Sequence, residues 1–500
     1  MFLRLLLNAT LVVSLATLGL ACGDDNDDHD GHDHDNTPAV TPDDNTNTGD
    51  NTNTGDNTNT GDNTNTGDNT NTGDDPTITI PADNTYTFEA ALEGETGSTV
   101  SYGGQVQRQI LIWEIKNYMG KTLKGLVDGD DTVEAGATLA KLNQWFDFNA
   151  EQDADMKTSI LAEDDLAEAT ISEIGSKKLA DKIAGESGFE GALQGWNTEL
   201  PVPTFDEDGN ITGSETKVPA TPKELVHAFF QMADDLAVAR DEGDQGEDPE
   251  GNALPEVYLN TIGHDVAQLT QKFLLGAVTL NQGLGKYLKV IEEQQNTTNY
   301  KNDASKNYTA MEHYWDEAFG YFGAARDYAA YTDDEIAGKA TAEGARKGYH
   351  DANGDGKIDL KSEYNFGNSV NAAKRDRSGS TTDFTKDAWD AWVRGRAIIT
   401  AHVGKDFADW SDAMKAELRA QVTKIGEAWV GAVAATALHY INDTAGDMAK
   451  CGQEGYSYKD HAKHWGEMKG FALGLVFNPN SPLHEEVESY CYAPPPTGAG

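Results

Sequence analysis

The stretch at residues 311–328, MEHYWDEAFGYFGAARDY, decides the fold class of this chain. Its large apolar side chains Tyr314, Trp315, Phe319 and Phe322 recur at spacings that place them on one side of a helix. A one-sided apolar face needs a partner to cover it. The stretch therefore predicts a helix packed among other helices.

Apolar residues recur at the same spacing over most of the remaining chain. The segments with this pattern are Gln105 to Leu123, Pro222 to Arg240, Pro255 to Gln295, Ala304 to Tyr331, Asp383 to Val403, Asp406 to Met448 and Tyr458 to Phe477. We expect an all-α fold of one helical bundle, or of two.

Two segments depart from the helical pattern. Residues 76–100 alternate Thr, Ile and Tyr, which predicts a short strand or an ordered arm. The segment PVPTFDEDGNITGSETKVP around Gly209 predicts a small β-hairpin with an Asp-Gly turn. These are the only β elements that we expect.

Charge excludes one class of partner. The chain has 500 residues and a formal net charge of −46, with 38% hydrophobic residues and nine Trp, enough for a large folded region. From residue 76 onward, 69 acidic residues still face 37 basic ones. Such a surface repels phosphate backbones, so we expect no nucleic-acid partner.

The N-terminus has the features of an export signal. Residues 1–21 carry Arg4 and an apolar run, and the LGLAC site resembles the processing site of bacterial lipoproteins, which predicts lipidation of Cys22. An ordinary cleaved signal is the alternative. We expect an outer-membrane lipoprotein of the bacterial cell envelope, periplasmic or surface-exposed, attached to the membrane by its lipid.

Residues 22–75 are rich in Asp and His and contain five copies of DNTNTG, a composition that cannot bury a core. We expect a disordered tether between the lipid and a folded domain at residues 76–500. The two remaining cysteines, Cys451 and Cys491, are an even pair in an oxidising compartment, which predicts a disulfide. Two buried free thiols are the alternative.

The segment at residues 351–363, DANGDGKIDLKSE, matches the start of an EF-hand calcium loop. The expected Ca²⁺ ligands are Asp351, Asn353, Asp355, the carbonyl of Lys357, Asp359 and Glu363. The closing Glu stands one position later than usual, because Ser362 occupies the twelfth position. We expect a structural calcium ion that stabilises a connection between helices; a solvated acidic turn without metal is the alternative.

Two distant helices each carry a His and a carboxylate one turn apart. His313 and Glu317 form one pair, and His464 and Glu467 form the other. Two such pairs from facing helices would complete a four-ligand site for a transition metal, Fe or Zn. The alternative is that both histidines are ordinary hydrogen-bonded residues of half-buried helices.

Five blocks of the chain resemble an uncharacterised family of bacterial lipoproteins, domain of unknown function 4856. They are SYGGQVQRQILIWEIKNYM, QKFLLGAVTLNQ, EHYWDEAFGYFG, DGKIDLKSEYNFG and HWGEMKGFALGLVFNP, which together cover approximately Tyr102 to Cys491. That family is similar, more faintly, to the imelysin-like helical lipoproteins associated with iron uptake. The resemblance implies an exported helical bundle and metal ligation, without a settled reaction.

No enzyme signature accompanies these features, since HExxH and GxSxG are absent from the sequence. We therefore expect a metal-binding component of metal acquisition, most plausibly of iron, with an envelope protein as a further partner. An exported metal-dependent hydrolase and an adhesin-like interaction protein with purely structural calcium are the alternatives.

Overall fold

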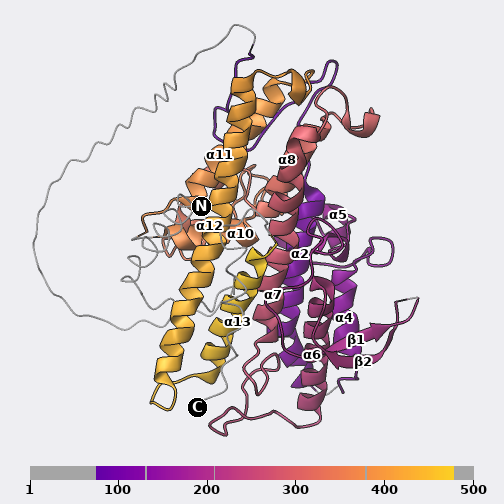
Figure 1. Ribbon diagram of the computed structural model, residues 1–500, viewed down its shortest axis with the longest axis vertical. Coiled ribbons are helices and arrows are strands. Elements are labelled where there is room, and N and C mark those ends of the chain that lie inside the picture. Colours follow the sequence, from indigo (N-terminus) through magenta and orange to yellow (C-terminus); the bar gives the residue numbers. More distant parts are fainter. Residues whose placement is uncertain (1–74, 130–131, 208, 378–379, 478–500) are drawn as a thin grey trace, which may run out of the picture.

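A bundle of lengthwise helices forms the elongated body of the protein, in a computed structural model that describes residues 75–477 apart from 130–131, 208 and 378–379 (Figure 1). Its longest helix, α12 (Asp412–Lys450), has 39 residues and so extends about 58 Å. Helix α11 (Phe384–Ala401) packs against its first half, and α13 (Tyr458–Leu475) packs against its second half.

A continuous helical run through the centre is buried on all sides. It begins as α7 (Val266–Leu274), and its later part contains π-helical and 3₁₀ turns at Leu275–Leu280, Gly283–Tyr287 and Leu288–Glu293. Every residue from 266 to 284 is buried, including the polar residues Gln268, Thr270, Gln271, Lys272, Thr279, Asn281 and Gln282, so this run is covered by neighbouring helices on all sides. The sequence places the start of this helix at Pro255, but the structure begins it after Asp265, whose side chain accepts from the N–H of Gln268.

Two glycines let the central run and α13 approach closely. A Cβ added to Gly276 would lie 2.1 Å from the Cα of Gly474 on α13. Only glycine, which has a hydrogen atom in place of a side chain, fits at this contact. The positions of Gly276 on the central run and Gly474 on α13 therefore set where the two helices cross.

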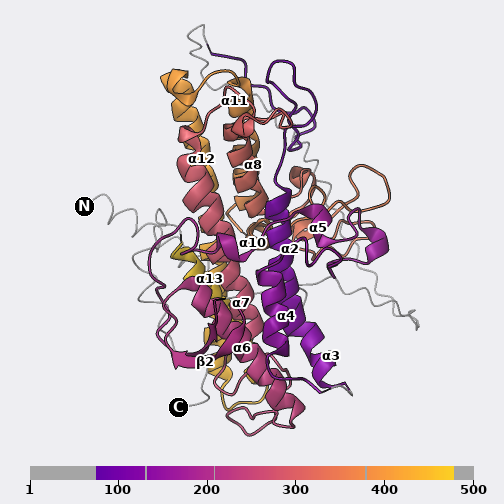
Figure 2. The same cartoon turned by 90° about the vertical axis from the view of Figure 1, so that its right-hand side faces the viewer.

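Further helices surround this centre in both views (Figures 1 and 2). They are α2 (Gly103–Asn117) with the π turn Tyr118–Thr122, α3 (Leu123–Val127), α4 (Ala137–Phe146), α5 (Ile171–Ile174), α6 (Pro222–Asp241), α8 (Ala310–Phe322), α9 (Asp333–Ile336) and α10 (Gly367–Asp376). Short 3₁₀ turns lie at Glu163–Asp165, Ala180–Lys182, Tyr300–Asn302, Tyr328–Ala330 and Phe407–Asp409.

Capping explains where α8 begins and ends. Thr309 and Glu312 form a reciprocal capping box at its start, and Gly323, with φ of 90°, ends it. The helix expected from Ala304 to Tyr331 is therefore shorter than the apolar pattern suggests.

The expected β-hairpin is present. Strand β1 (Leu200–Phe205) pairs antiparallel with β2 (Ile211–Lys217), and the turn between them contains Gly209 at φ 84°. The expected N-terminal arm, residues 76–100, contains no strand of its own and makes one isolated β-bridge, between Glu89 and Ser98.

One large hydrophobic core connects the helices, with a small satellite cluster around Leu254, Leu259 and Tyr458. Four tryptophans lie fully or almost fully buried in the main core: Trp315, Trp389, Trp392 and Trp429. The all-α class is thus confirmed. Among the described residues, no helix has both the length and the hydropathy of a membrane span.

Candidate functional site

His313 lies in the first turns of α8 between two tyrosine rings. The ring centroids of Tyr300 and Tyr308 are 4.6 Å and 5.0 Å from that of the imidazole. Its Nε2 is 3.7 Å from Oε1 of Glu317, and the same carboxylate oxygen accepts from Nε2 of Gln105 at 2.6 Å. The predicted pair on α8 therefore forms, in an aromatic and largely buried setting.

His464 and Glu467 have other partners. His464 Nδ1 lies 2.7 Å from Oδ2 of Asp447 on α12, and although burial alone lowers the pKa of His464, this carboxylate raises it overall. Glu467 is 2% exposed and faces Nζ of Lys272 on α7 at 3.6 Å. The two residues of this predicted pair thus point to different neighbours.

The four predicted transition-metal ligands do not converge. On α11, Arg394 binds Glu417, and its neighbour Arg396 binds the α8 residue Glu312, so α8 lies beside the start of α12. His464 binds Asp447, thirty residues further along α12, which is about 45 Å away. Among the described residues, no three His, Cys, Asp or Glu side chains form a group that could hold a metal. The structure therefore does not bring His313 and Glu317 together with His464 and Glu467.

The calcium-type loop is held by its own hydrogen bonds. Asp351 accepts from the N–H groups of Gly354, Asp355 and Gly356, as position one of such a loop does. Glu363, 2% exposed, accepts from the backbone across the loop, with Oε1 binding the N–H of residues 352 and 353 and Oε2 that of residue 359. Glu363 thus closes the loop, as expected, but onto backbone N–H groups.

The other expected ligands of this loop lie on its exposed side. The side chains of Asn353, Asp355 and Asp359 accept from the backbone two residues later. Lys357 extends its Nζ to the carbonyls of Asp164 and Leu166, and so fastens the loop to a segment that is distant in sequence. Calcium binding by the loop stays a prediction.

Two predicted covalent features fall on residues outside the described part of the chain. The first is the lipidation of Cys22. The second is the disulfide between Cys451 and Cys491, of which Cys491 lies outside the described residues. Cys451 itself lies directly after α12 with its thiol 3.8 Å from the carbonyl oxygen of Asp447. Lipidation and the disulfide both stay predictions.

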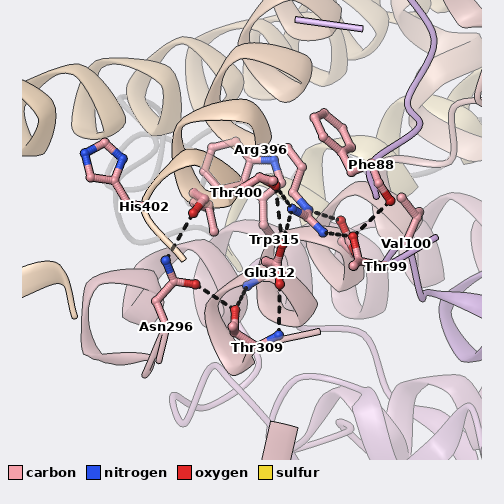
Figure 3. Close-up of polar contacts among 12 residues, drawn as sticks. Phe88, Thr99, Val100, Asn296, Thr309, Glu312, Trp315, Arg396, Thr400 and His402 are labelled. Carbon is pink, nitrogen blue, oxygen red and sulfur yellow. Dashed lines mark hydrogen bonds and ion pairs between the residues drawn. The ribbon is translucent and has the colours of Figure 1, made fainter. Parts of the chain in front are cut away.

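A buried charge network joins the N-terminal arm to α8 and α11 (Figure 3). Arg396 is completely buried and donates to Asp316 at 2.8 Å, to Glu312 at 2.9 Å and to the hydroxyl of Thr99 in the arm at 2.7 Å. It also donates to the hydroxyl of Thr400, one turn along α11.

Asp316 forms the second link between the arm and α8. Its Oδ1 accepts from the hydroxyl of Tyr86 at 2.8 Å and its Oδ2 from the N–H of Ser101 at 3.3 Å. Burial raises the pKa of Asp316, and Arg396 opposes that rise. Because both carboxylates and the guanidinium have partners within the protein, this network suits a structural fastening of the arm rather than chemistry on a ligand.

A cavity of about 330 Å³ lies between α2, α7 and α10. Each helix presents one face to it: Gln109, Ile112 and Trp113 from α2; Gln271 and Lys272 from α7, with Leu275 just beyond; and Gly367, Val370, Asn371 and Lys374 from α10. The connection after α9 and the base of the calcium-type loop, from Lys347 to Gly348 and from Tyr364 to Phe366, complete its wall.

The charged side chains that line this cavity are all lysines, of which Lys272 is balanced by the carboxylate of Glu467. Its lining includes Lys272, Lys347 and Lys374 and contains no Asp or Glu. The first turn of α10 has no acidic residue and no side-chain cap, so its N-terminal N–H groups and helix dipole add to the positive potential. The sequence reasoning missed this site; the signal was the basic pair Lys374-Arg375 in an acidic chain.

Fold and cavity together define an all-α protein with a lysine-containing cavity between α2, α7 and α10. The chain belongs to the family described as a domain of unknown function, DUF4856, which matches residues 83–488. No curated protein and no solved structure matches it. The expected similarity to imelysin-like proteins stays a prediction.

Proposed function

We propose that this protein is a membrane-tethered binding protein of the bacterial cell envelope that takes a small anionic ligand into the cavity between α2, α7 and α10. One observation carries the proposal: the cavity is lined by three lysines and no carboxylate, in a chain of net charge −46. If the residues around a cavity had the average composition of this acidic chain, they would include more acidic than basic side chains.

The cavity suits a small molecule. Its 330 Å³ is at the lower end of the range for ligand sites and has room for about eleven waters. Side-chain amides from Gln109, Gln271 and Asn371 add donors and acceptors for polar groups of the ligand. At physiological ionic strength, acids more than about 8 Å away are largely screened, so groups close to the cavity set its potential: the lysines of its lining, and Glu467, which balances Lys272 at 3.6 Å.

This proposal changes the expected role in metal acquisition. Direct ligation by His313, Glu317, His464 and Glu467 has lost its geometric basis, because His464 lies about 45 Å along the bundle from the α8 pair. A metal would instead reach the cavity as an anionic chelate, its charge supplied by carboxylates. We therefore propose a role in metal acquisition, iron included, in which the protein binds the metal as such a chelate.

The other two alternatives gain no specific support. A metal-dependent hydrolase needs several ligands around an open coordination position, and the described residues provide no such group. An adhesin would present a broad apolar patch, whereas among the exposed large apolar residues that the structure describes only Phe205 and Ile211 are paired across the hairpin, and others such as Ile80, Leu126 and Ile262 lie on separate segments.

We also propose that the loop at residues 351–363 binds Ca²⁺ as a structural ion. The supporting observation is that its residues already adopt a tight turn, with Asp351 bonded to the N–H of Gly356 and Glu363 folded back over the loop. Carboxylate and carbonyl oxygens are the ligands that Ca²⁺ prefers. Residues on both sides of this loop line the cavity, so the ion would also steady one wall of it.

The anion proposal is tested by calorimetric titration with phosphate, citrate, ferric citrate and a linear dicarboxylate, against choline as a cationic control. We expect at least one anion to bind and choline not to bind. The double variant Lys347→Met/Lys374→Met should weaken binding at least tenfold, while Lys405→Met, which removes an exposed charge away from the cavity, should not. Failure of every anion to bind would overturn the proposal.

A further inference from the structure

A short segment that precedes the hairpin holds Lys182 against the central helical run. The side-chain amide of Gln282, which is completely buried, donates to the carbonyl oxygens of Lys182 at 3.0 Å and of Ser187 at 2.9 Å. The N–H of Ala184 donates to the carbonyl oxygen of Ala277 at 2.8 Å. These bonds fix the backbone on both sides of Lys182, so its side chain starts from a defined place beside the run.

Two lysines meet at one buried tyrosine of the central run. Tyr287 is 4% exposed, and its hydroxyl oxygen accepts from Nζ of Lys182 at 3.4 Å. Nζ of Lys286 lies 6.0 Å from the centre of the same ring and donates to the hydroxyl of Ser187 at 2.7 Å. Both lysines are half-buried, so their ammonium groups share a setting that is partly shielded from water and still reached from outside.

The third cation of this group is Arg108 on α2. Its Nε donates to the carbonyl oxygen of Lys178 at 2.8 Å, four residues before Lys182, and the side chain is 3% exposed. Among the residues that the structure describes, Lys182 makes no ion pair with a carboxylate. Lys182 therefore has positive neighbours and lacks the close acidic partner that usually keeps a lysine protonated.

This surrounding favours the neutral amine of Lys182. Burial is the largest cause of a lowered pKa of Lys182, which falls to about 8, and the positive charges of Lys286 and Arg108 act in the same direction. Glu317 and Asp181 oppose the shift with smaller effects. At pH 7.5 about a quarter of such an amine is neutral, against about one part in a thousand at the usual pKa of lysine. The neutral amine is the form that attacks a carbonyl carbon.

We infer that Lys182 is a reactive lysine, which forms an imine with a small aldehyde that carries a negatively charged group. Its nitrogen attacks the carbonyl carbon, a C=N bond replaces the C=O bond, and the carbonyl oxygen leaves as water with the two amine hydrogens. The reaction needs no oxidant or reductant. Lys286 would bind the negative group of the aldehyde, and Arg108 would add to the positive potential. None of these three residues lines the cavity between α2, α7 and α10, so the inference is independent of the proposed function.

Labelling of the folded full-length chain with pyridoxal phosphate, an aldehyde with a phosphate group, tests the inference. Borohydride converts each imine into a stable amine, and peptide mass spectrometry then identifies the labelled lysines. At pH 7.5 we expect Lys182 to be labelled at least about tenfold faster than the exposed Lys405. The rate at Lys182 should reach half of its maximum near pH 8. Pyridoxal, which lacks the phosphate, should label Lys182 more slowly.

Two variants test the role of the neighbouring charge. Lys286→Met should slow the labelling of Lys182 at least about threefold at pH 7.5 and move its half-maximum to higher pH. Lys405→Met, which also removes one lysine charge, should leave that labelling unchanged, and thermal melting of each variant confirms folding. The inference is overturned if Lys182 in the parent reacts no faster than Lys405, or if Lys286→Met reacts like the parent. Equal rates with pyridoxal and pyridoxal phosphate would overturn the requirement for a negative group.

Discussion

Removing the guanidinium of Arg396 should be among the most damaging single changes in this protein. The side chains of Arg396, Glu312 and Asp316 are at most 1% exposed, and Arg396 is the cation that balances the two carboxylates. Arg396→Met keeps the apolar volume but leaves both carboxylates buried without it. Breaking a buried ion pair in this way costs about 3–5 kcal/mol.

The expected loss of stability is large compared with the total free energy of unfolding of the protein. Domains of ordinary stability unfold with about 5–15 kcal/mol, so the variant should lose at least about a fifth of its stability. The arm should loosen as well, because the hydroxyl of Thr99 accepts a hydrogen bond from Arg396 and the hydroxyl of Tyr86 donates one to Asp316. Urea unfolding followed by tryptophan fluorescence measures the first effect, and limited proteolysis within residues 75–102 measures the second.

Two further variants make the test specific. Arg419→Met removes an exposed arginine that binds Glu292 through two hydrogen bonds, and it should change the stability far less than Arg396→Met does, because solvent screens this pair. Adding Glu312→Gln and Asp316→Asn to Arg396→Met removes the unbalanced charge and should restore a large part of the loss. An Arg396→Met protein within about 1 kcal/mol of the parent, or one whose arm resists proteolysis unchanged, would refute the reasoning.

Three other predictions concern single features of the fold. Burial among aromatic rings lowers the pKa of His227 to about 4, so the folded state binds a proton at this residue less tightly than the unfolded chain does. The stability that this group contributes is complete above about pH 6.5 and falls by roughly 3 kcal/mol as the pH drops to 4. The variant His227→Leu should flatten that part of the pH–stability curve, measured by urea unfolding. Gly276→Ala should destabilise the protein by about 1–3 kcal/mol, because the added methyl group collides with the backbone at Gly474. Gly426→Ala is the control: a Cβ at this position of α12 meets no other atom, so the change should stabilise the protein by up to about 1 kcal/mol. Equal shifts of the melting temperature in the two variants would contradict the close crossing of the helices. Calcium should raise the melting temperature of the parent, EDTA should reverse the rise, and Glu363→Gln should abolish it; a parent indifferent to calcium would rule out the structural ion.

The helical class could be predicted because amphipathic spacing is a local property. The periodicity of Trp315, Phe319 and Phe322 identifies a helix whatever its neighbours are, and each of these side chains is buried as expected. The ends of helices were less predictable. The run expected from Pro255 begins only after Asp265, because a capping side chain and turn geometry decide the boundary.

Helix α10 escaped prediction because its sequence, GNSVNAAKRD, has few large apolar residues. Small side chains such as Ala372 and Ala373 are completely buried there, so packing against α12 rather than periodicity makes the segment helical. Since α10 supplies one wall of the cavity, missing it meant missing the candidate site.

The sequence by itself determined the all-α class, the hairpin, the calcium-type turn and the pairing of His313 with Glu317, because each depends on residues near one another in the chain. Only the tertiary structure decided which distant groups meet. It placed His464 beside Asp447 instead of His313, and it collected three lysines around one cavity. The physical reason is that spacing within a helix sets a direction around its axis, whereas the position along the bundle depends on how helices of unequal length pack against one another.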